Sequence, residues 1–258
     1  MSEQNDKKFL YGLDDEFTFS CDRTLPCFNT CCRDINIFLT PYDVLRMRKS
    51  LWMPSDEFLK TYTLAFLGDD GIPYVVLKMK EDQEKTCPFV GPEGCTIYND
   101  RPWSCRMFPV FPTSSEEVEF LIEEKLSCHG FRSKSSTTVR QWKKNQNISQ
   151  YDHMNEEYKK ITLHDYFLNG NKLDPGKSKL VYSACYDLDA FKRFVFGTRF
   201  LEIYDIDEQT VKAIKNDDEE LLNFAYRWVE FNLFSGGDLK LRDKEMDKLL
   251  RSNSEAAS

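Results

Sequence analysis

Four thiols fall within 12 residues in the stretch Cys21-Asp-Arg-Thr-Leu-Pro-Cys27-Phe-Asn-Thr-Cys31-Cys32-Arg33-Asp34, and two of them are adjacent. A second group follows along the chain at Cys87, Cys95, Cys105 and Cys128, and only Cys185 stands apart. Thiols crowded in this way, among Pro and Gly residues, are more typical of ligands than of small buried side chains. We therefore expect the first half of the chain to fold around whatever these cysteines bind.

The bulk composition is that of an ordinary globular protein. Hydrophobic residues make up 41% and charged residues 30% of the 258 residues, and this length suffices for one large domain or two small ones with a real core. Such a chain does not need disulfides merely to fold. The net charge of −8 and the isoelectric point near 5.1 argue against nucleic acid as a partner, because phosphate binding needs a basic face.

The hydropathy of the chain predicts a cytoplasmic protein. The first eight residues show no apolar run behind a positive start, so we expect no secretory signal. No stretch approaches the roughly 18 apolar residues of a membrane helix, so no membrane span is expected either. Thiols stay reduced in the cytoplasm, where clustered cysteines indicate metal or redox ligands rather than a disulfide framework.

Local patterns predict short strands near the cysteines and helices in the second half. Alternating residues at 35–39 and a β-branched run at 72–80 indicate strands, and 118–122 is assigned as another. Thr40-Pro41-Tyr-Asp43 is typical of a helix start, with Thr40 as the cap and Pro41 in the first helical position. Further helices are expected at 55–68, before Pro109, and at 138–147, 150–169, 187–203, 207–215 and 217–234. Residues 1–15 are expected to be loose, and Asp174-Pro-Gly to form a turn.

These elements predict an α+β fold. The polar Ser/Thr stretch at 133–138 is interpreted as a linker. We therefore expect a small cysteine-rich metal-binding domain with a short sheet at 1–132, followed by a helical region at 133–258. The aromatic side chains of the helices between 187 and 234 are expected to form a core rather than a peptide-binding groove.

The residue type at the clustered positions points to a soft metal. Thiolates select zinc, copper(I) or iron–sulfur clusters. A four-coordinate zinc ion or a four-iron cluster takes four thiolates, so eight cysteines suffice for one or two centres. The candidate metal ligands are Cys21, Cys27, Cys31, Cys32, Cys87, Cys95, Cys105 and Cys128. Since adjacent thiols rarely face one tetrahedral ion together, Cys31 and Cys32 either serve two centres or include one residue outside the ligand set. Cys185 is expected to be a small buried side chain.

Other charged and imidazole groups flank the thiols. Four thiolates around a zinc ion or an oxidised four-iron cluster leave a charge of about −2, which nearby guanidinium groups could offset. The three arginines in question are Arg33, Arg101 and Arg106, and ordinary surface or packing charge is the alternative for each. His129 is an alternate ligand beside Cys128, whereas His153 and His164 are expected to be surface or packing residues. The chain has no nucleotide-binding glycine loop and no H-E-x-x-H motif, and no catalytic residue is assigned.

Four segments together resemble the YkgJ family of cysteine-cluster proteins, which are described as zinc- or iron-chelating domains. The segments are Cys27-Phe-Asn-Thr-Cys31-Cys32-Arg33-Asp34, Leu39-Thr40-Pro41-Tyr42-Asp43-Val44, Cys87-Pro88-Phe89 and Gly94-Cys95-Thr-Ile-Tyr98-Asn-Asp-Arg101-Pro102-Trp-Ser-Cys105-Arg106-Met-Phe-Pro109. The resemblance implies that the thiols hold a metal. Shorter members show C-x2-C-x2-CC, whereas the spacing here is C-x5-C-x3-CC, which makes Cys21 a weaker candidate than Cys27.

Three hypotheses about function follow. The first is a metal-binding protein with an iron–sulfur cluster of the [4Fe-4S] type or zinc. The second is an enzyme that modifies a protein substrate. This hypothesis comes from the resemblance, because the flagellin lysine methylase is similar in its cysteine pattern and is described as an iron–sulfur protein. Nothing in the second half of the sequence indicates a methyl-donor pocket. The third is a structural zinc module that presents its helical half to a protein partner.

Overall fold

The computed structural model describes residues 7–113, 119–124 and 127–243. The fold is α+β, as predicted, with about 49% helix and 16% strand. Two compact units make up the chain: a cysteine unit of residues 1–39 and 76–153, and a helical unit of residues 40–75 and 154–258. These units interleave along the chain, whereas the sequence suggested one boundary between residues 132 and 133.

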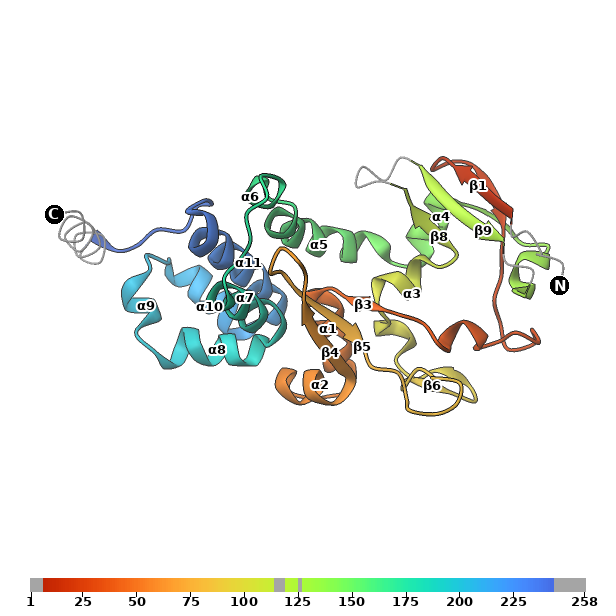
Figure 1. The fold of residues 1–258 in the computed structure, drawn as a ribbon, viewed down its shortest axis with the longest axis horizontal. Helices are drawn as coiled ribbons and strands as arrows, with labels where there is room; N and C mark the ends of the chain where they lie inside the picture. The colour runs from red at the N-terminus through yellow and green to blue at the C-terminus, as the bar shows by residue number, and fades with distance from the viewer. Residues whose placement is uncertain (1–6, 114–118, 125–126, 244–258) are drawn as a thin grey trace. The chain divides into compact units, whose positions relative to one another are not determined.

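Short antiparallel strands make up the sheets of the cysteine unit (Figure 1). One sheet has the order β1 (Lys7–Tyr11), β9 (Phe120–Glu124), β8 (Val110–Pro112), while β2 (Glu16–Thr18) pairs with β10 (Ser136–Thr138) and β6 (Val90–Gly91) pairs with β7 (Gly94–Cys95). Two sequence predictions are wrong here. Residues 1–15, which were expected to be loose, contain β1, and residues 133–138, which were expected to be a linker, contain β10. The strand expected at 118–122 is β9, and its part at 118 lies outside the described residues.

Short helices, one further strand and the end of another complete the cysteine unit. The α-helices are α3 (Trp103–Met107) and α4 (Val139–Asn145), and the 3₁₀ turns are η1 (Thr30–Cys32), η2 (Tyr98–Asp100) and η3 (His129–Arg132). The strand expected at 35–39 is reduced to β3 (Phe38–Leu39). The β-branched run predicted as a strand is β5 (Pro73–Leu77), whose Leu77 N–H donates to the Ile37 carbonyl (2.9 Å).

One hydrophobic core supports the cysteine unit. Its side chains come from strands and from helices, because β9 buries alternate residues, Phe120 and Ile122, and α3 and α4 each bury one apolar side chain. The buried members are Phe17, Phe19, Met107, Val110, Phe120, Ile122, Val139 and Ile148. Cys128 and Trp103 pack against this core. The core therefore lies directly beneath residues that flank or include the candidate ligands.

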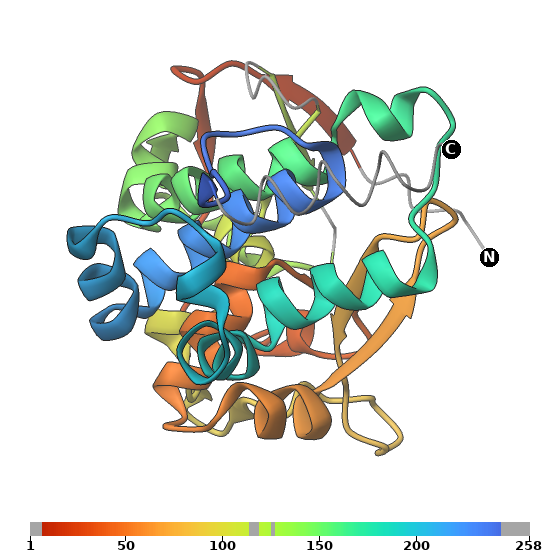
Figure 2. The same cartoon turned by 90° about the vertical axis from the view of Figure 1, so that its left-hand side faces the viewer.

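Helices dominate the helical unit (Figures 1 and 2). They are α1 (Pro41–Ser50), α2 (Ser55–Tyr62), α6 (Asp165–Leu168), α7 (Pro175–Val181), the π-helical turn η4 (Tyr182–Tyr186), α8 (Leu188–Gly197), α9 (Phe200–Ile203), α10 (Glu208–Asn216) and α11 (Asp218–Phe234). The long α5 (Ile148–Thr162) begins in the cysteine unit and ends in this one. Helix α11 lies at the centre, since it contacts α1, α7, α8, α10 and η4. Within the described residues no helix is long and apolar enough to span a bilayer.

Local capping explains most of the helix starts in this unit. Thr40 forms the predicted cap of α1: its hydroxyl accepts from Asp43 N–H (3.2 Å) while the Asp43 carboxylate accepts from Thr40 N–H (2.8 Å). The turn predicted at Asp174 is instead a helix start, because Asp174 accepts from Lys177 N–H (3.0 Å) and Pro175 takes the first helical position of α7.

The helix expected at 55–68 ends early, at Tyr62. Residues 63–67 form strand β4 (Thr63–Leu67), which pairs with β5 through a tight turn in which Gly68 N–H donates to the Ile72 carbonyl (2.9 Å). Thr, Leu and Phe fit a strand as well as a helix, so the pairing with β5 decides between them. The aromatic helices form a core as predicted. Phe200 lies within ring contact of Phe191, Phe194, Phe224 and Trp228.

Candidate metal centre

All eight candidate ligands lie in the cysteine unit, and every cysteine of the chain is a free thiol. Cys185 lies in the helical unit, where it is 1% exposed within η4. Burial raises its pKa well above the ordinary thiol value. Cys185 is therefore the inert, buried side chain that the sequence predicted.

Turns and a 3₁₀ helix shape the first cysteine loop. The Asp22 carboxylate accepts from Thr24 N–H (2.8 Å), and Leu25 N–H donates to the Asp22 carbonyl (3.2 Å). Phe28 N–H then donates to the Leu25 carbonyl (2.9 Å). Asn29 has a φ of 66°, a left-handed conformation that Asn tolerates better than most residues, and it leads into η1. This compact loop delivers four thiols from a short stretch of chain without the entropy of closing long loops.

A first set of neighbouring thiols consists of Cys21, Cys27, Cys31 and Cys128. Backbone contacts bring the set together: Ser20 N–H donates to the Gly130 carbonyl (3.1 Å), and His129 N–H donates to the Cys27 sulfur (3.2 Å). Gly130 permits this approach, since a Cβ there would lie 2.7 Å from the Phe19 ring. Burial raises the pKa of Cys21 to about 11, with further contributions from the other three thiols of the set.

A second set consists of Cys32, Cys87, Cys95 and Cys105. Cys87 N–H donates to the Cys32 carbonyl (2.8 Å), which fixes the first loop against the second. The hairpin β6–β7 pairs Val90 with Cys95, and Cys105 comes from α3. The pKa of Cys32 is raised by its hydrogen bond with Cys31, by burial and by the neighbouring Cys31, Cys87 and Cys105 thiols. Burial also raises the pKa of Cys87, and Cys95 adds to the effect.

The first loop docks onto the hairpin that carries part of the second set. Asn29 Nδ2 donates to the Gly91 carbonyl (3.2 Å), and Arg23 forms an ion pair with Glu93. The Phe28 ring covers Gly94, where a Cβ would lie 3.2 Å away and where φ is 111°, so only glycine suits this position. These contacts hold the two sets on adjoining loops of one unit.

The adjacent pair is divided between the two sets. Cys31 and Cys32 neighbour each other, and beyond this contact Cys31 neighbours Cys21 and Cys128, whereas Cys32 neighbours Cys87 and Cys105. The hydrogen bond with Cys32 lowers the pKa of Cys31 below the ordinary thiol value.

The fit of these sets to a metal rests on the chemistry of the donors. Within residues 7–113, 119–124 and 127–243, no three His, Cys, Asp or Glu side chains form an arrangement that could hold a metal ion. Each set nevertheless offers four soft sulfur donors, the number that a zinc ion or a four-iron cluster takes. The donor type and number therefore suit either group.

Two arginines lie buried around the second set. Arg106, 4% exposed, donates to the carbonyls of Arg101 (3.0 Å), Gln146 (2.8 Å) and Asn99. Arg101, 8% exposed, donates to the Tyr98 carbonyl and to Gln146 Oε1, and burial lowers its pKa while Cys105 and Cys95 act in the opposite direction. Arg101 is thus a counter-charge for these thiols, and Arg106 organises the backbone around them.

The remaining flanking residues have other contacts. Arg33 forms an exposed ion pair with Glu84. His129 contributes its backbone N–H to Cys27, as described above. His164 is a packing residue, as predicted, because its ring stacks on Phe234 at 3.8 Å between centroids and its Nδ1 accepts from Tyr166 N–H. The role of Gln146 as an acceptor for the two arginines was not predicted, because it lies 40 residues from Arg106 and no local sequence pattern marks the contact.

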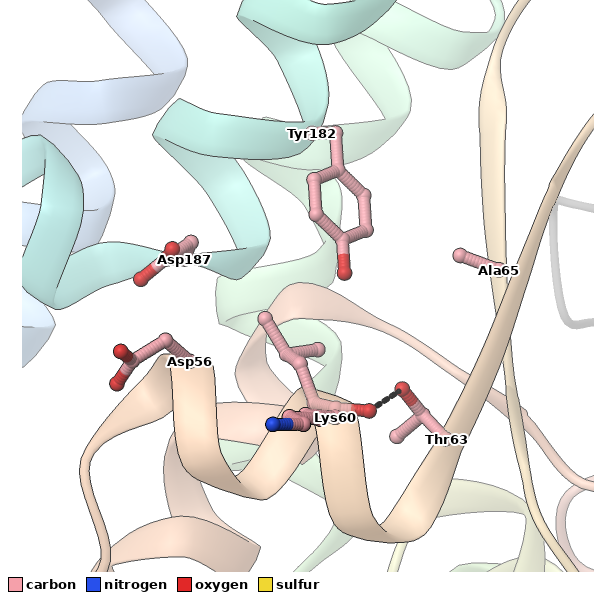
Figure 3. Close-up of a pocket in the computed structure, with 7 residues that line it drawn as sticks. Asp56, Lys60, Thr63, Ala65, Tyr182 and Asp187 are labelled. Carbon is pink, nitrogen blue, oxygen red and sulfur yellow. Dashed lines mark hydrogen bonds between the residues drawn. The ribbon is translucent and has the colours of Figure 1, made fainter.

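A pocket of about 220 Å³ lies in the helical unit (Figure 3). Its lining residues are Asp56, Leu59, Lys60, Thr63, Ala65, Tyr182 and Asp187. Several polar groups here already serve local structure: Thr63 donates to the Leu59 carbonyl (2.7 Å), and Asp187 accepts from Ser55 Oγ (2.6 Å) and Ala190 N–H (3.2 Å). The pocket is therefore a feature of helix packing.

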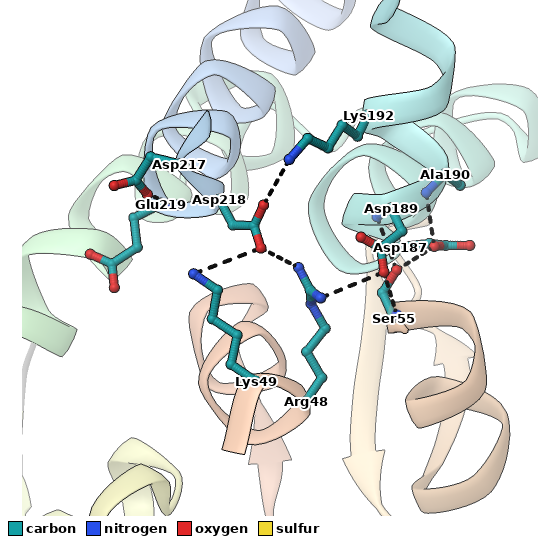
Figure 4. Close-up of polar contacts among 10 residues, drawn as sticks. All are labelled: Arg48, Lys49, Ser55, Asp187, Asp189, Ala190, Lys192, Asp217, Asp218 and Glu219. Carbon is teal, nitrogen blue, oxygen red and sulfur yellow. Dashed lines mark hydrogen bonds and ion pairs between the residues drawn. The ribbon is translucent and has the colours of Figure 1, made fainter. Parts of the chain in front are cut away.

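A polar network ties α1 to α8 and α11 in the helical unit (Figure 4). The Arg48 guanidinium contacts the carboxylates of Asp218 (2.8 Å) and Asp189 (3.5 Å). Lys192 and Lys49 also pair with Asp218, at 3.2 Å and 3.7 Å. Each of these charges has an opposite partner on another helix, so the network connects the helices and does not resemble a reactive site.

Comparison with known proteins agrees with the thiol chemistry. A family model described as a “Putative zinc- or iron-chelating domain” matches residues 20–159, a span that includes all eight clustered cysteines and more than half of the chain. No curated protein and no solved structure matches the chain. The match confirms the predicted resemblance to a cysteine-cluster family and supports a metal-binding role. The chain belongs to the CxxCxxCC family of zinc- or iron-chelating domains.

Proposed function

We propose that this protein holds two metal centres, one on each set of four cysteines. The observation that carries the proposal is the arrangement of the eight thiols around the adjacent pair. The chain at Cys128 meets the first loop where His129 N–H donates to the Cys27 sulfur (3.2 Å), on the side of Cys31, while Cys87 N–H donates to the Cys32 carbonyl (2.8 Å). Two adjacent residues that lie near different thiols can deliver one sulfur to each of two tetrahedral arrangements. A single centre would leave half of the clustered thiols without a role.

Each centre is proposed to be a [4Fe-4S] cluster, with zinc as the alternative. Both groups accept ligation by cysteine alone. Both leave a charge of about −2 on a four-thiolate site, and the buried Arg101 beside Cys95 and Cys105 suits that charge. A cytoplasmic location, which we also propose, would keep the thiols reduced.

Metal analysis of protein purified without oxygen tests the proposal. For two [4Fe-4S] clusters we expect a brown protein with sulfur-to-iron absorption, and about eight iron and eight acid-labile sulfide per chain. A colourless protein with two zinc ions per chain would support the zinc alternative. One centre per chain would contradict the division into two sets, and the absence of stoichiometric metal would overturn the metal-binding function.

The role of the metal is a separate question. The described residues give no observation that favours the methylase-like alternative, so methyl transfer forms no part of this proposal. A structural zinc module remains compatible with the two sets. For such a module we expect that replacing Cys31 or Cys32 lowers the stability of the cysteine unit, as measured by hydrogen exchange, and leaves the helical unit intact.

A further inference from the structure

We infer that the two centres differ in lability, so that the metal on the first set exchanges with ligands from solution while the metal on the second set is retained. This inference rests on the proposed function, since it requires both sets to be occupied. It identifies the set Cys21, Cys27, Cys31 and Cys128 as the one through which the protein gives up or accepts metal.

The exposure of the thiols carries the first step. In the first set Cys21 and Cys31 are exposed and the other two are half-buried. In the second set Cys87 is buried and the other three are half-buried. A chelator or an incoming thiol must reach the metal, or a freed ligand, before it can displace a thiolate, and the shell around a site controls that access. The first set therefore offers a direct route of attack.

The anchoring of the chain gives the second step. Cys21 is followed by the exposed residues Asp22, Arg23 and Thr24, which are held by turns within the loop and by an exposed ion pair from Arg23 to Glu93. The second set is flanked by buried residues, among them Phe89, Ile97 and Arg101. Loops that bury little apolar surface unfold locally at low free energy, whereas segments packed in a core do not. Cys21 can therefore leave its metal at a lower cost than Cys87.

Charge gives the third step. Arg101 acts on Cys95 and Cys105, both in the second set. A buried guanidinium beside thiolates offsets the charge that they place on the metal, and this favours the bound state. The cations of the first loop, Arg23 and Arg33, are exposed and paired with Glu93 and Glu84, so solvent and their partners screen them. The metal on the second set is therefore the one that the protein retains.

Zinc release from the full-length chain tests the inference. The protein is loaded with Zn²⁺ under reducing, oxygen-free conditions and mixed with an excess of the chromogenic chelator 4-(2-pyridylazo)resorcinol. We expect two phases of equal amplitude whose rates differ by at least about tenfold, the scale on which the surroundings of a metal site change its affinity. Cys31→Ser should remove the fast phase and Cys32→Ser the slow phase, although the two positions are adjacent. Cys185→Ala, in the helical unit, is the control that should keep both phases.

Other outcomes separate this inference from the proposed function. Fewer than two zinc ions bound to the unaltered chain would overturn the function itself. Two zinc ions released at one rate would overturn the inference alone, as would loss of the slow phase in Cys31→Ser. If Cys32→Ser does not fold, the release phases of Cys21→Ser and Arg101→Met test the inference instead. Cys21→Ser should abolish only the fast phase, and Arg101→Met should accelerate only the slow phase, with Arg101→Lys closer to the original rate.

Discussion

The cysteine unit and the helical unit achieve order in different ways. The strands of the cysteine unit have two to five residues, and its candidate ligands lie in loops, in η1, in β7 and in the five-residue helix α3. The helical unit contains α11, a helix of 17 residues that buries eight side chains against its neighbours. Elements as short as β6 and β7 cannot persist alone, whereas a long amphipathic helix in a bundle is stabilised along its whole length.

The difference shows where a ligand is needed. Apolar burial and matched charges suffice for the helical unit, in which the Phe200 cluster and the Arg48 network connect its helices. In the cysteine unit a hydrophobic core lies under one part, while the loops of both thiol sets are held by turns, hydrogen bonds and a few buried side chains. Metal binding to such loops would contribute directly to folding. The comparison therefore predicts two units that respond differently to the same perturbation.

Removal of the metal should give the largest difference. We expect a chelator with reductant to expose the amides of β7 and α3 to hydrogen exchange and to leave those of α11 protected. The reason is the free energy of metal binding, which is about 10 kcal/mol or more in small zinc domains. Hydrogen exchange with mass spectrometry measures both regions in one sample. Equal loss of protection in α11 would show that the helical unit also depends on the metal and would break the comparison.

A core substitution should produce the reverse pattern. Phe200 is 1% exposed and packs against Phe194 at 5.3 Å between ring centroids. Phe200→Ala should lower the free energy of unfolding by about 3–5 kcal/mol, because it leaves a cavity. Urea denaturation followed by circular dichroism measures this loss, and metal content should not change. Phe194→Ala, at a position that is 41% exposed, is the matched control and should cost less than half as much. A fall in bound metal for Phe200→Ala would count against independent units.

The sequence predicted the helical unit better than the cysteine unit because its signals are local. Thr40 and Asp43 lie three residues apart, and their reciprocal capping bonds are visible in the sequence pattern. Strand β1 pairs with β9, with Phe9 opposite Ile122, and β10 pairs with β2. No local pattern marks such partners. A polar start and a Ser/Thr-rich stretch therefore resembled loose chain until their distant partners were known.

The candidate site was predicted in type but not in arrangement. Residue identity and crowding indicate thiolate ligands for a soft metal, and the family match agrees. The partition into two sets depends on contacts such as the bond from Ser20 to Gly130, which joins parts of the chain 110 residues apart. Spacing alone could not decide whether Cys31 and Cys32 serve the same centre. Gln146, which accepts from both Arg101 and Arg106, was likewise invisible.

The charge network sharpens the comparison through pH. Burial disfavours the ionised form of Asp218, but Arg48, Lys192 and Lys49 outweigh it, so its pKa lies below the ordinary value. The resulting stability is fully present above the usual Asp pKa of about 3.9 and is lost as pH falls through the lowered value. Asp218→Asn should cost the helical unit about 2–3 kcal/mol near neutral pH, because hydrogen bonds between charged groups are lost.

Denaturation curves between pH 2.5 and 7 check both parts of this prediction. The unaltered protein should lose stability in the helical unit at the acid end, and Asp218→Asn should show a flatter profile there. Asp205→Asn, at an exposed position, is the control and should follow the unaltered protein. An unchanged acid profile in Asp218→Asn would show that the network does not set the pH dependence.

The smallest effect offers the finest test, because each unit contains a threonine helix cap. The Thr40 hydroxyl accepts from Asp43 N–H at 3.2 Å in the helical unit, and the Thr138 hydroxyl accepts from Gln141 N–H at 3.1 Å in the cysteine unit. Replacing either by Ala should cost about 1 kcal/mol in its own unit. The two losses should differ in their dependence on metal. Thr40→Ala should be equally destabilising with and without chelator, since the helical unit is folded in both cases.

Thr138→Ala should be measurable only while the metal is bound, because a unit that has already lost its order cannot lose a cap. Hydrogen exchange of the amides in α1 and α4, with and without chelator, compares the two variants directly. If Thr138→Ala weakens α4 to the same extent after chelation, the cysteine unit retains its core fold without metal. The hydrophobic core around Phe120 would then be sufficient on its own, and the contribution of the metal would be confined to the two cysteine loops.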